Sequence, residues 1–154
     1  MTSAIAAQPS AASSSAATII VRQTAPRILL ADDSEEVSRI VAALLEKEFE
    51  VVGLAKDGQE VLELVPKCCP NALVLDLFMP SLNGLETAHH IRASGSPTAV
   101  VILTVQDDPD FVEAAISVGA LGYVLKPHIN TDLVPAIWTV LQGKMYVSPA
   151  LSLC

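Results

Sequence analysis

Polar side chains that can perform chemistry stand directly after apolar runs in this chain of 154 residues. They are Asp32, Asp33, Asp76, Thr104 and Lys126. Three carboxylates in one cleft repel each other unless a cation lies among them, and Mg²⁺ prefers such oxygen ligands. A carboxylate can attack a phosphoryl group to form an acyl phosphate, while an ammonium and a hydroxyl stabilise the transferring oxygens. These residue types together indicate phosphoryl transfer to an aspartate.

Each of these residues also has an ordinary explanation when it is taken alone. An Asp32-Asp33 pair before a helix is typical of a helix cap, and an aspartate such as Asp76 after a strand is typical of a turn. Thr104 could end a β-branched run, and Lys126 could be a solvated surface charge. The chemical interpretation therefore requires a fold that brings all five side chains to one place.

Strand and helix signals alternate along the chain from residue 27 onward. Apolar runs predict strands at 28–31, 50–55, 72–75, 99–103 and 122–125, and helical patterns cover 35–45, 59–67, 84–93, 107–119 and 132–142. Because the strands are apolar on both faces, we predict an α/β fold, a doubly wound five-stranded parallel sheet with helices on both faces, of the flavodoxin-like type. Sites in such sheets lie beyond the carboxyl ends of the strands, where the five polar residues stand.

Composition limits the classes of protein to which the chain can belong. Its net charge is −8, and an acidic surface repels phosphate backbones, so we expect no direct nucleic-acid binding by this segment. No apolar stretch approaches the length of a membrane span, so no membrane contact is expected. The cysteines Cys68, Cys69 and Cys154 have neither metal-ligand spacing nor a disulfide framework. They are typical of idle thiols in a reducing compartment, and we expect a cytoplasmic protein.

The chain divides into three parts by composition. Residues 1–26 are half Ala or Ser and contain no acid, which favours a disordered leader over an organelle transit peptide. Residues 27–143 carry the alternating pattern of the domain, and residues 144–154 are expected to be a C-terminal tail or the start of a linker.

The segment from Arg27 to Pro149 resembles the receiver domain of two-component response regulators. Asp32-Asp33 matches the acidic pair of that family, and Asp76 with its Met-Pro-x-x-x-Gly tail matches the phosphoacceptor strand. Thr104, Tyr123 and Lys126-Pro127 match the switch hydroxyl, the switch aromatic and the ammonium. Residues 105–149 resemble the nitrate-regulator-type (NarL/FixJ-like) subfamily, whose members usually continue into a helix-turn-helix DNA-binding domain. No such domain lies within this sequence, so it resembles either part of a longer regulator or a stand-alone receiver.

The resemblance implies a role for each matched residue. Asp76 is expected to accept a phosphoryl group from a sensor histidine kinase or a small phosphodonor. Mg²⁺ is expected to bind Asp33, Asp76 and the backbone carbonyl of Phe78, with Asp32 acting partly through water. Thr104 and Lys126 would contact the phosphoryl oxygens, and Thr104 and Tyr123 would form the switch.

Further expectations concern conformation, lifetime and output. The Lys126–Pro127 bond is expected to be cis, and Phe78 and Gln106 are expected to tune the lifetime of the phosphorylated state. The protein would catalyse only its own phosphorylation and dephosphorylation and would not otherwise be an enzyme. It could form a phosphorylation-dependent homodimer and control transcription through a DNA-binding domain. Alternatively, it could act alone as a phosphorelay or protein-interaction switch.

Other classes of protein place chemistry at the same edge of an α/β sheet. Phosphatases of the haloacid-dehalogenase type use a strand-end aspartate, but they need a second acid two residues later, where this chain has Phe78. Nucleotide and flavin binders use glycine-rich phosphate loops, which follow none of the predicted strands. A purely structural interaction module would need none of the five polar residues.

Overall fold

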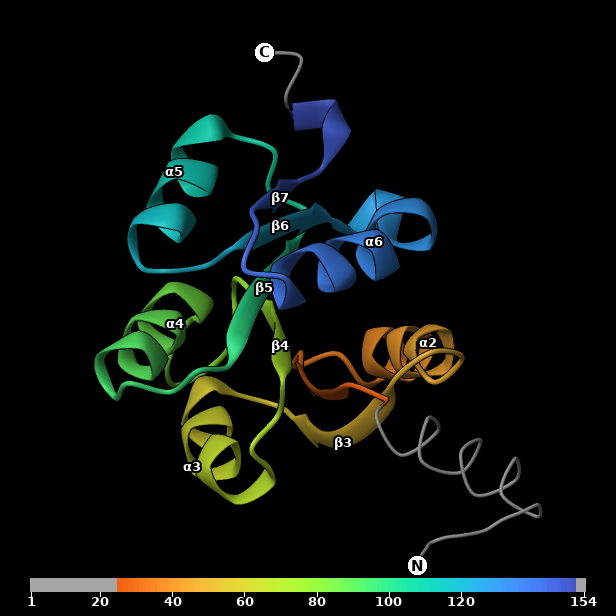
Figure 1. Ribbon diagram of the computed structural model, residues 1–154. Helices are drawn as coiled ribbons and strands as arrows, with labels where there is room; N and C mark the ends of the chain where they lie inside the picture. The colour runs from red at the N-terminus through yellow and green to blue at the C-terminus, as the bar shows by residue number, and fades with distance from the viewer. Residues whose placement is uncertain (1–24, 152–154) are drawn as a thin grey trace, which may run out of the picture.

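The computed structural model describes residues 25–151, which form one six-stranded parallel sheet covered by helices on both faces (Figure 1). The predicted leader lies outside the described residues except for its last two, and Cys154 also lies outside them. The strand order is β3-β2-β4-β5-β6-β7, so the chain winds in both directions from β2. The strands are β2 (Arg27–Ala31), β3 (Glu50–Ala55), β4 (Ala72–Asp76), β5 (Ala99–Thr104), β6 (Gly122–Leu125) and β7 (Tyr146–Val147). The predicted doubly wound fold is confirmed.

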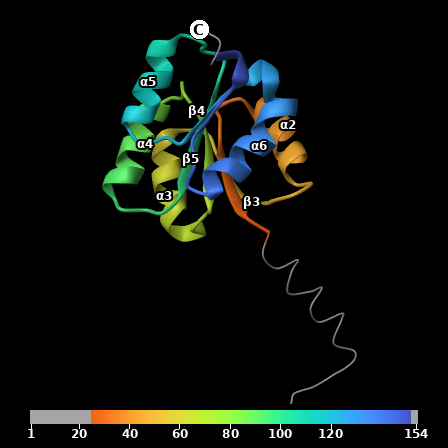
Figure 2. The same ribbon diagram turned by 45° about the horizontal axis from the view of Figure 1, so that its top comes forward.

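Five α-helices connect the strands of the described part of the chain. They are α2 (Glu35–Leu45), α3 (Gly58–Cys68), α4 (Gly84–Ala93), α5 (Pro109–Ser117) and α6 (Ile129–Leu141). Helices α2 and α6 cover one face, and α3, α4 and α5 cover the other (Figure 2). None of the helices formed by residues 25–151 is both long and apolar enough to cross a membrane.

The two faces of the sheet have separate hydrophobic cores because successive strand residues point in opposite directions. In β2, Ile28 and Leu30 belong to the core on the side of α2 and α6, whereas Leu29 and Ala31 belong to the core on the side of α3, α4 and α5. Both sets are buried. This explains why the strand sequences are continuously apolar instead of alternating with polar residues.

Polar residues fix where the helices begin. Ser34 accepts a hydrogen bond from the amide of Val37 and caps α2, and Asp57 caps α3 in the same way. Asn83 and Glu86 form a reciprocal capping box at the start of α4. These contacts hold the helix starts beside the carboxyl ends of the strands, where the polar residues converge.

The end of the domain differs from the predicted pattern. Residues 146–147 form the sixth strand, which pairs in parallel with β6. The buried hydroxyl of Ser148 donates to Asp132 Oδ2 at 2.8 Å and accepts from the amide of Leu125 at 3.0 Å. The segment expected to be a tail or linker therefore contributes to the sheet and to a buried polar contact.

Two further predictions for the region after β6 differ from the structure. The prediction of a cis peptide bond between Lys126 and Pro127 was wrong, since the described residues contain no cis peptide bond. Trans is the lower-energy isomer, and it places Pro127 in the first turn of a 3-10 helix, Lys126–His128, where a missing amide hydrogen costs little. Helix α6 then begins at Ile129, three residues earlier than predicted, and Pro135 is accommodated within it.

Candidate functional site

The fold brings the predicted polar residues to one edge of the sheet. Asp32 follows β2, Asp76 ends β4, Thr104 ends β5 and Lys126 follows β6. These four strands are neighbours and run in parallel, so their carboxyl ends meet at the same edge. Asp32 and Asp33 are not the cap of α2, because Ser34 serves as its N-cap. Their carboxylates remain available to the site.

Three carboxylates converge at this edge. Asp32, Asp33 and Asp76 each offer an oxygen, and these oxygens lie within 4.8 Å of one another. Asp32 and Asp76 are buried while Asp33 is exposed, which leaves the cluster open to solvent on one side. Oδ1 of Asp32 accepts from the amide of Ser34 at 2.8 Å, and its buried Oδ2 forms an ion pair with the Lys126 ammonium. Three carboxylate oxygens this close together, on a side open to solvent, fit a hard divalent cation such as Mg²⁺.

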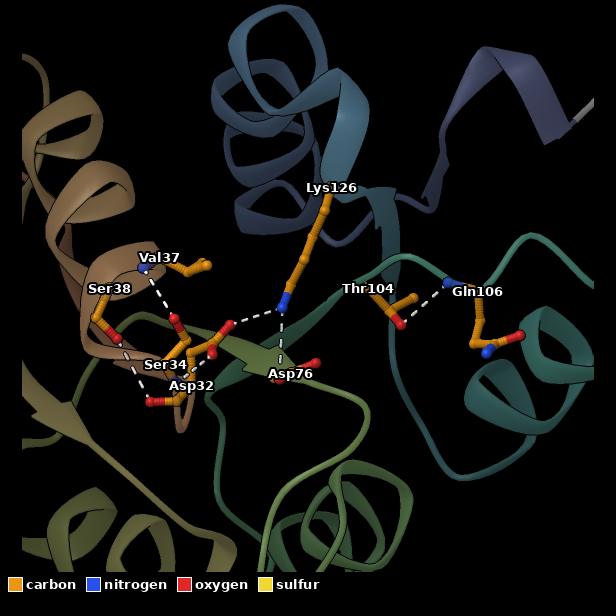
Figure 3. Close-up of polar contacts among 8 residues, drawn as sticks. All are labelled: Asp32, Ser34, Val37, Ser38, Asp76, Thr104, Gln106 and Lys126. Atoms are coloured by element: carbon orange, nitrogen blue, oxygen red, sulfur yellow. Dashed lines mark hydrogen bonds and ion pairs between the residues drawn. The ribbon is translucent and has the colours of Figure 1, made fainter.

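Lys126 supplies the positive charge of the site. Its side chain extends from the end of β6 and ends between Asp32 and Asp76 (Figure 3). Nζ lies 2.9 Å from Oδ2 of Asp32 and 3.5 Å from Oδ2 of Asp76. Burial alone lowers the pKa of Lys126, but the two carboxylates outweigh it and raise the pKa above its usual value. Lys126 is therefore an ammonium at neutral pH.

Asp76 is a carboxylate whose negative charge is only partly compensated. Burial and the negative charge of Asp32 raise its pKa from 3.8 to about 6, against the opposing effects of Lys126 and of a hydrogen bond from the Phe78 amide. The group is ionised at neutral pH, yet its negative charge is only partly balanced. A carboxylate in this condition gains from an added cation and retains electron density that can attack an electrophile.

Thr104 and Tyr123 are joined through the backbone of Gln106. The Thr104 hydroxyl accepts from the amide of Gln106 at 3.2 Å, and the Tyr123 hydroxyl donates to the carbonyl of Gln106 at 2.7 Å. The Tyr123 ring is fully buried, and burial together with Asp107 and Asp108 raises its pKa to about 12. The Tyr123 side chain therefore points into the protein, and its hydroxyl stays protonated and able to donate a hydrogen bond.

Phe78 lies two residues beyond Asp76 and is not packed into the core. Its side chain is 51% exposed, and its ring lies edge-on to Phe111 of α5, with centroids 5.7 Å apart and an interplanar angle of 79°. The helical pattern predicted for residues 107–119 does not reveal this contact. A contact between a loop and a distant helix leaves no periodic signal in the sequence.

Gly84 explains the glycine in the Met-Pro-x-x-x-Gly motif. A Cβ atom at this position would clash with the carbonyl oxygen of Asp76 and approach the Leu77 Cα to 2.9 Å. Without a side chain, the Gly84 amide can donate to the Leu77 carbonyl at 2.8 Å. The loop can therefore fold back so that α4 starts directly against the residue that ends β4.

The fold and this edge define a class: doubly wound α/β proteins with an acidic cluster and an ammonium at the carboxyl ends of the strands. The family model described as "Response regulator receiver domain" matches residues 28–138. The chain belongs to this family of receiver domains of two-component signalling, which confirms the resemblance found in the sequence.

Curated relatives agree with this assignment. The chain is 34% identical over 136 residues to the transcriptional regulatory protein DegU of Brevibacillus brevis, covering 86% of this chain and 57% of that protein. It is 38% identical over 112 residues to the transcriptional regulatory protein PdtaR of Mycobacterium tuberculosis, covering 72% and 54% respectively. The chain thus spans about half the length of the curated relatives it matches.

Solved structures give the same result. A LuxR-family two-component response regulator from Aurantimonas sp. SI85-9A1 has a TM-score of 0.80 and 32% identity, covering 84% of this chain and 94% of that one. The receiver domain of the response regulator NarL from Mycobacterium tuberculosis has a TM-score of 0.74 and 31% identity, covering 78% and 98%. The subfamily resemblance is confirmed by these neighbours.

Proposed function

We propose that this receiver accepts a phosphoryl group on Asp76 and changes its surface in response. The observation that supports this most directly is the position of Asp76, which lies among two other acids and within 3.5 Å of the Lys126 ammonium. The site combines a nucleophile, a cation position and a positive side chain at one sheet edge. Phosphoryl transfer requires this combination because negative charge is spread over the transferring oxygens.

In the proposed reaction, a carboxylate oxygen of Asp76 attacks the phosphorus of the donor. The bond between phosphorus and the donor's leaving atom breaks, and its electron pair remains with the donor. Lys126 moves from a shared position between two carboxylates to the new phosphoryl oxygens, and the Thr104 hydroxyl donates to them. Asp33, Asp76 and the carbonyl of Phe78 would hold Mg²⁺, with Asp32 acting partly through water. The ion would neutralise charge on the transferring group.

We propose that the effect of phosphorylation reaches the protein surface through Thr104 and Tyr123. Turning the Thr104 hydroxyl toward a phosphoryl group removes its contact with the Gln106 amide, and Gln106 also holds Tyr123. A change at the site would therefore reach the segment leading into α5 and the face that carries Tyr123. The donor is proposed to be a sensor histidine kinase or a small phosphodonor.

The relatives named as transcriptional regulators favour control of transcription through a further domain, with a homodimer of the phosphorylated form as one possible product. A stand-alone phosphorelay switch is the alternative. Turnover of external phosphate esters is not expected, because Phe78 occupies the position where an aspartate-nucleophile phosphatase carries its second acid.

Incubation with Mg²⁺ and acetyl phosphate tests the proposal by intact-protein mass spectrometry. The parent should gain one base-labile phosphoryl group, and Asp76→Asn should gain none. Asp57→Asn is the matched control: Asp57 also follows a strand of the sheet, and asparagine retains its capping role in α3. Labelling of Asp76→Asn to the same extent as the parent would show that Asp76 is not the acceptor.

A further inference from the structure

We propose that the Phe78 ring shields Asp76 and that Phe111 is a positioning residue that holds this ring in place, so that α5 helps to set the lifetime of the phosphorylated state. This inference rests on the proposed function, since it concerns hydrolysis of the group that Asp76 would carry. The family resemblance assigns a lifetime role to Phe78 and Gln106 and none to Phe111.

Phe78 is tied to the site at its backbone and to α5 at its side chain. Phe78 lies only two residues beyond Asp76, so its backbone stays close to that carboxylate. Its ring is half-exposed, and holding such a ring in one rotamer costs conformational entropy. The described ring contact of Phe78 is the edge-on contact with Phe111, in the geometry that aromatic pairs prefer.

Phe111 is well placed to act as a support. It lies in the first turn of α5, which Asp108 caps and Pro109 opens. Its half-buried side chain packs against the core cluster on the α3, α4 and α5 face. The Phe111 side chain thus contacts both the core cluster and the Phe78 ring. A Phe111 ring held in this way restricts the positions available to the more exposed Phe78 ring.

The contact also connects the site's two loops. Phe78 belongs to the loop after β4, and Phe111 follows the segment in which Gln106 binds both Thr104 and Tyr123. A displacement of that segment would carry the start of α5 and the Phe111 ring with it. The shielding of Asp76 would therefore depend on the state of the switch, not only on the identity of Phe78.

Hydrolysis is the step that this contact would slow. The oxygen of a water molecule attacks phosphorus in line with the bond to Asp76, that bond breaks, and its electron pair returns to the carboxylate. One proton of the water passes to the departing phosphate. The water must first fit beside the scissile bond, so a Phe78 ring held in place excludes it, and a freely rotating ring admits it more often.

A double-mutant cycle tests the pair. Phe78→Ala, Phe111→Ala and the double variant are phosphorylated with acetyl phosphate, the donor is removed, and the decay of the phosphorylated mass is followed. We expect each single variant to shorten the half-life by about twofold to tenfold, the range that an aromatic pair can supply. The double variant should decay no faster than the faster single variant, and Phe111→Tyr, which retains the ring, should match the parent within about twofold.

Val112→Ala is the matched control, because Val112 is the next residue of α5 and packs on the same core cluster. It should lower the unfolding midpoint while leaving the half-life unchanged. Equal shortening in Val112→Ala and Phe111→Ala, additive effects in the double variant, or a parental half-life in Phe111→Ala would each overturn the inference. If Phe111→Ala does not fold, Phe111→Leu replaces it. Failure of the parent to be phosphorylated at all would instead overturn the proposed function.

Discussion

The Asp76 carboxylate is expected to destabilise the folded protein. Removing its charge with Asp76→Asn should therefore raise the free energy of unfolding in the absence of Mg²⁺. The cause is burial together with the negative charge of Asp32, which raise the pKa of Asp76 from 3.8 to about 6. Asparagine has nearly the same shape and no charge, and Lys126 remains paired with Asp32 at 2.9 Å.

The magnitude and its pH dependence follow from linkage. Below the unfolded pKa, the carboxyl group is protonated in both states and contributes nothing. As the pH rises from 3.8 toward 6, the unfolded state releases its proton first and is favoured, and above about pH 6 the penalty is complete. A difference of about 2 pH units corresponds to about 3 kcal/mol, which screening at the solvent-open side of the site reduces to about 1–2 kcal/mol.

Urea denaturation with a chelator present measures this effect. Asp76→Asn should be more stable than the parent by about 1–2 kcal/mol at about pH 7.5, and by about half as much at about pH 5. Glu63→Gln, which removes a charge from an exposed position on α3, controls for net charge. Added Mg²⁺ should stabilise the parent more than the variant. Equal stabilities near neutral pH, or a difference that does not shrink on acidification, would refute the reasoning.

Four further variants address the metal, the switch and the lifetime. Asp33→Ala should weaken Mg²⁺ binding in calorimetry by about tenfold or more, because a charged oxygen ligand is lost, and unchanged affinity would remove Asp33 from the ligand set. Thr104→Ala should still be phosphorylated, but the NMR shifts around Tyr123 should respond only weakly to phosphorylation. Identical responses in parent and variant would contradict the proposed coupling between Thr104 and Tyr123. Phe78→Asn should shorten the phosphorylated half-life by about tenfold, whereas Gln106→Ala should change it less, and a longer half-life in Phe78→Asn would contradict shielding.

Much of the fold could be predicted because its signals are local. The predicted bounds of β3, α4 and β6 coincide with those of the structure, since mainly apolar runs, a strong cap or glycines mark them. The polar residues could be assigned to one edge because parallel strands place their carboxyl ends together. One local signal was overlooked: Ser34 followed by two glutamates is typical of a helix start, and it accounts for the cap of α2.

Other features depend on contacts between distant residues and could not be predicted. The two residues of β7 are too few to show a period, and pairing with β6 makes them a strand. The inward position of Tyr123 depends on a carbonyl seventeen residues away. The Phe78–Phe111 contact depends on how a loop and a helix meet, and a pattern in either segment alone does not reveal it.

The sixth strand has a consequence for how the domain avoids self-association. Without β7, the outer side of β6 would present its unpaired amides and carbonyls as an open edge next to buried residues such as Tyr123 and Val124. Open edges of this kind recruit strands from other molecules. β7 is short, and the Ser148 contact with Asp132 and Leu125 fastens it, so it covers an edge that could otherwise start aggregation. Residues 146–148 thus protect the sheet as well as extend it.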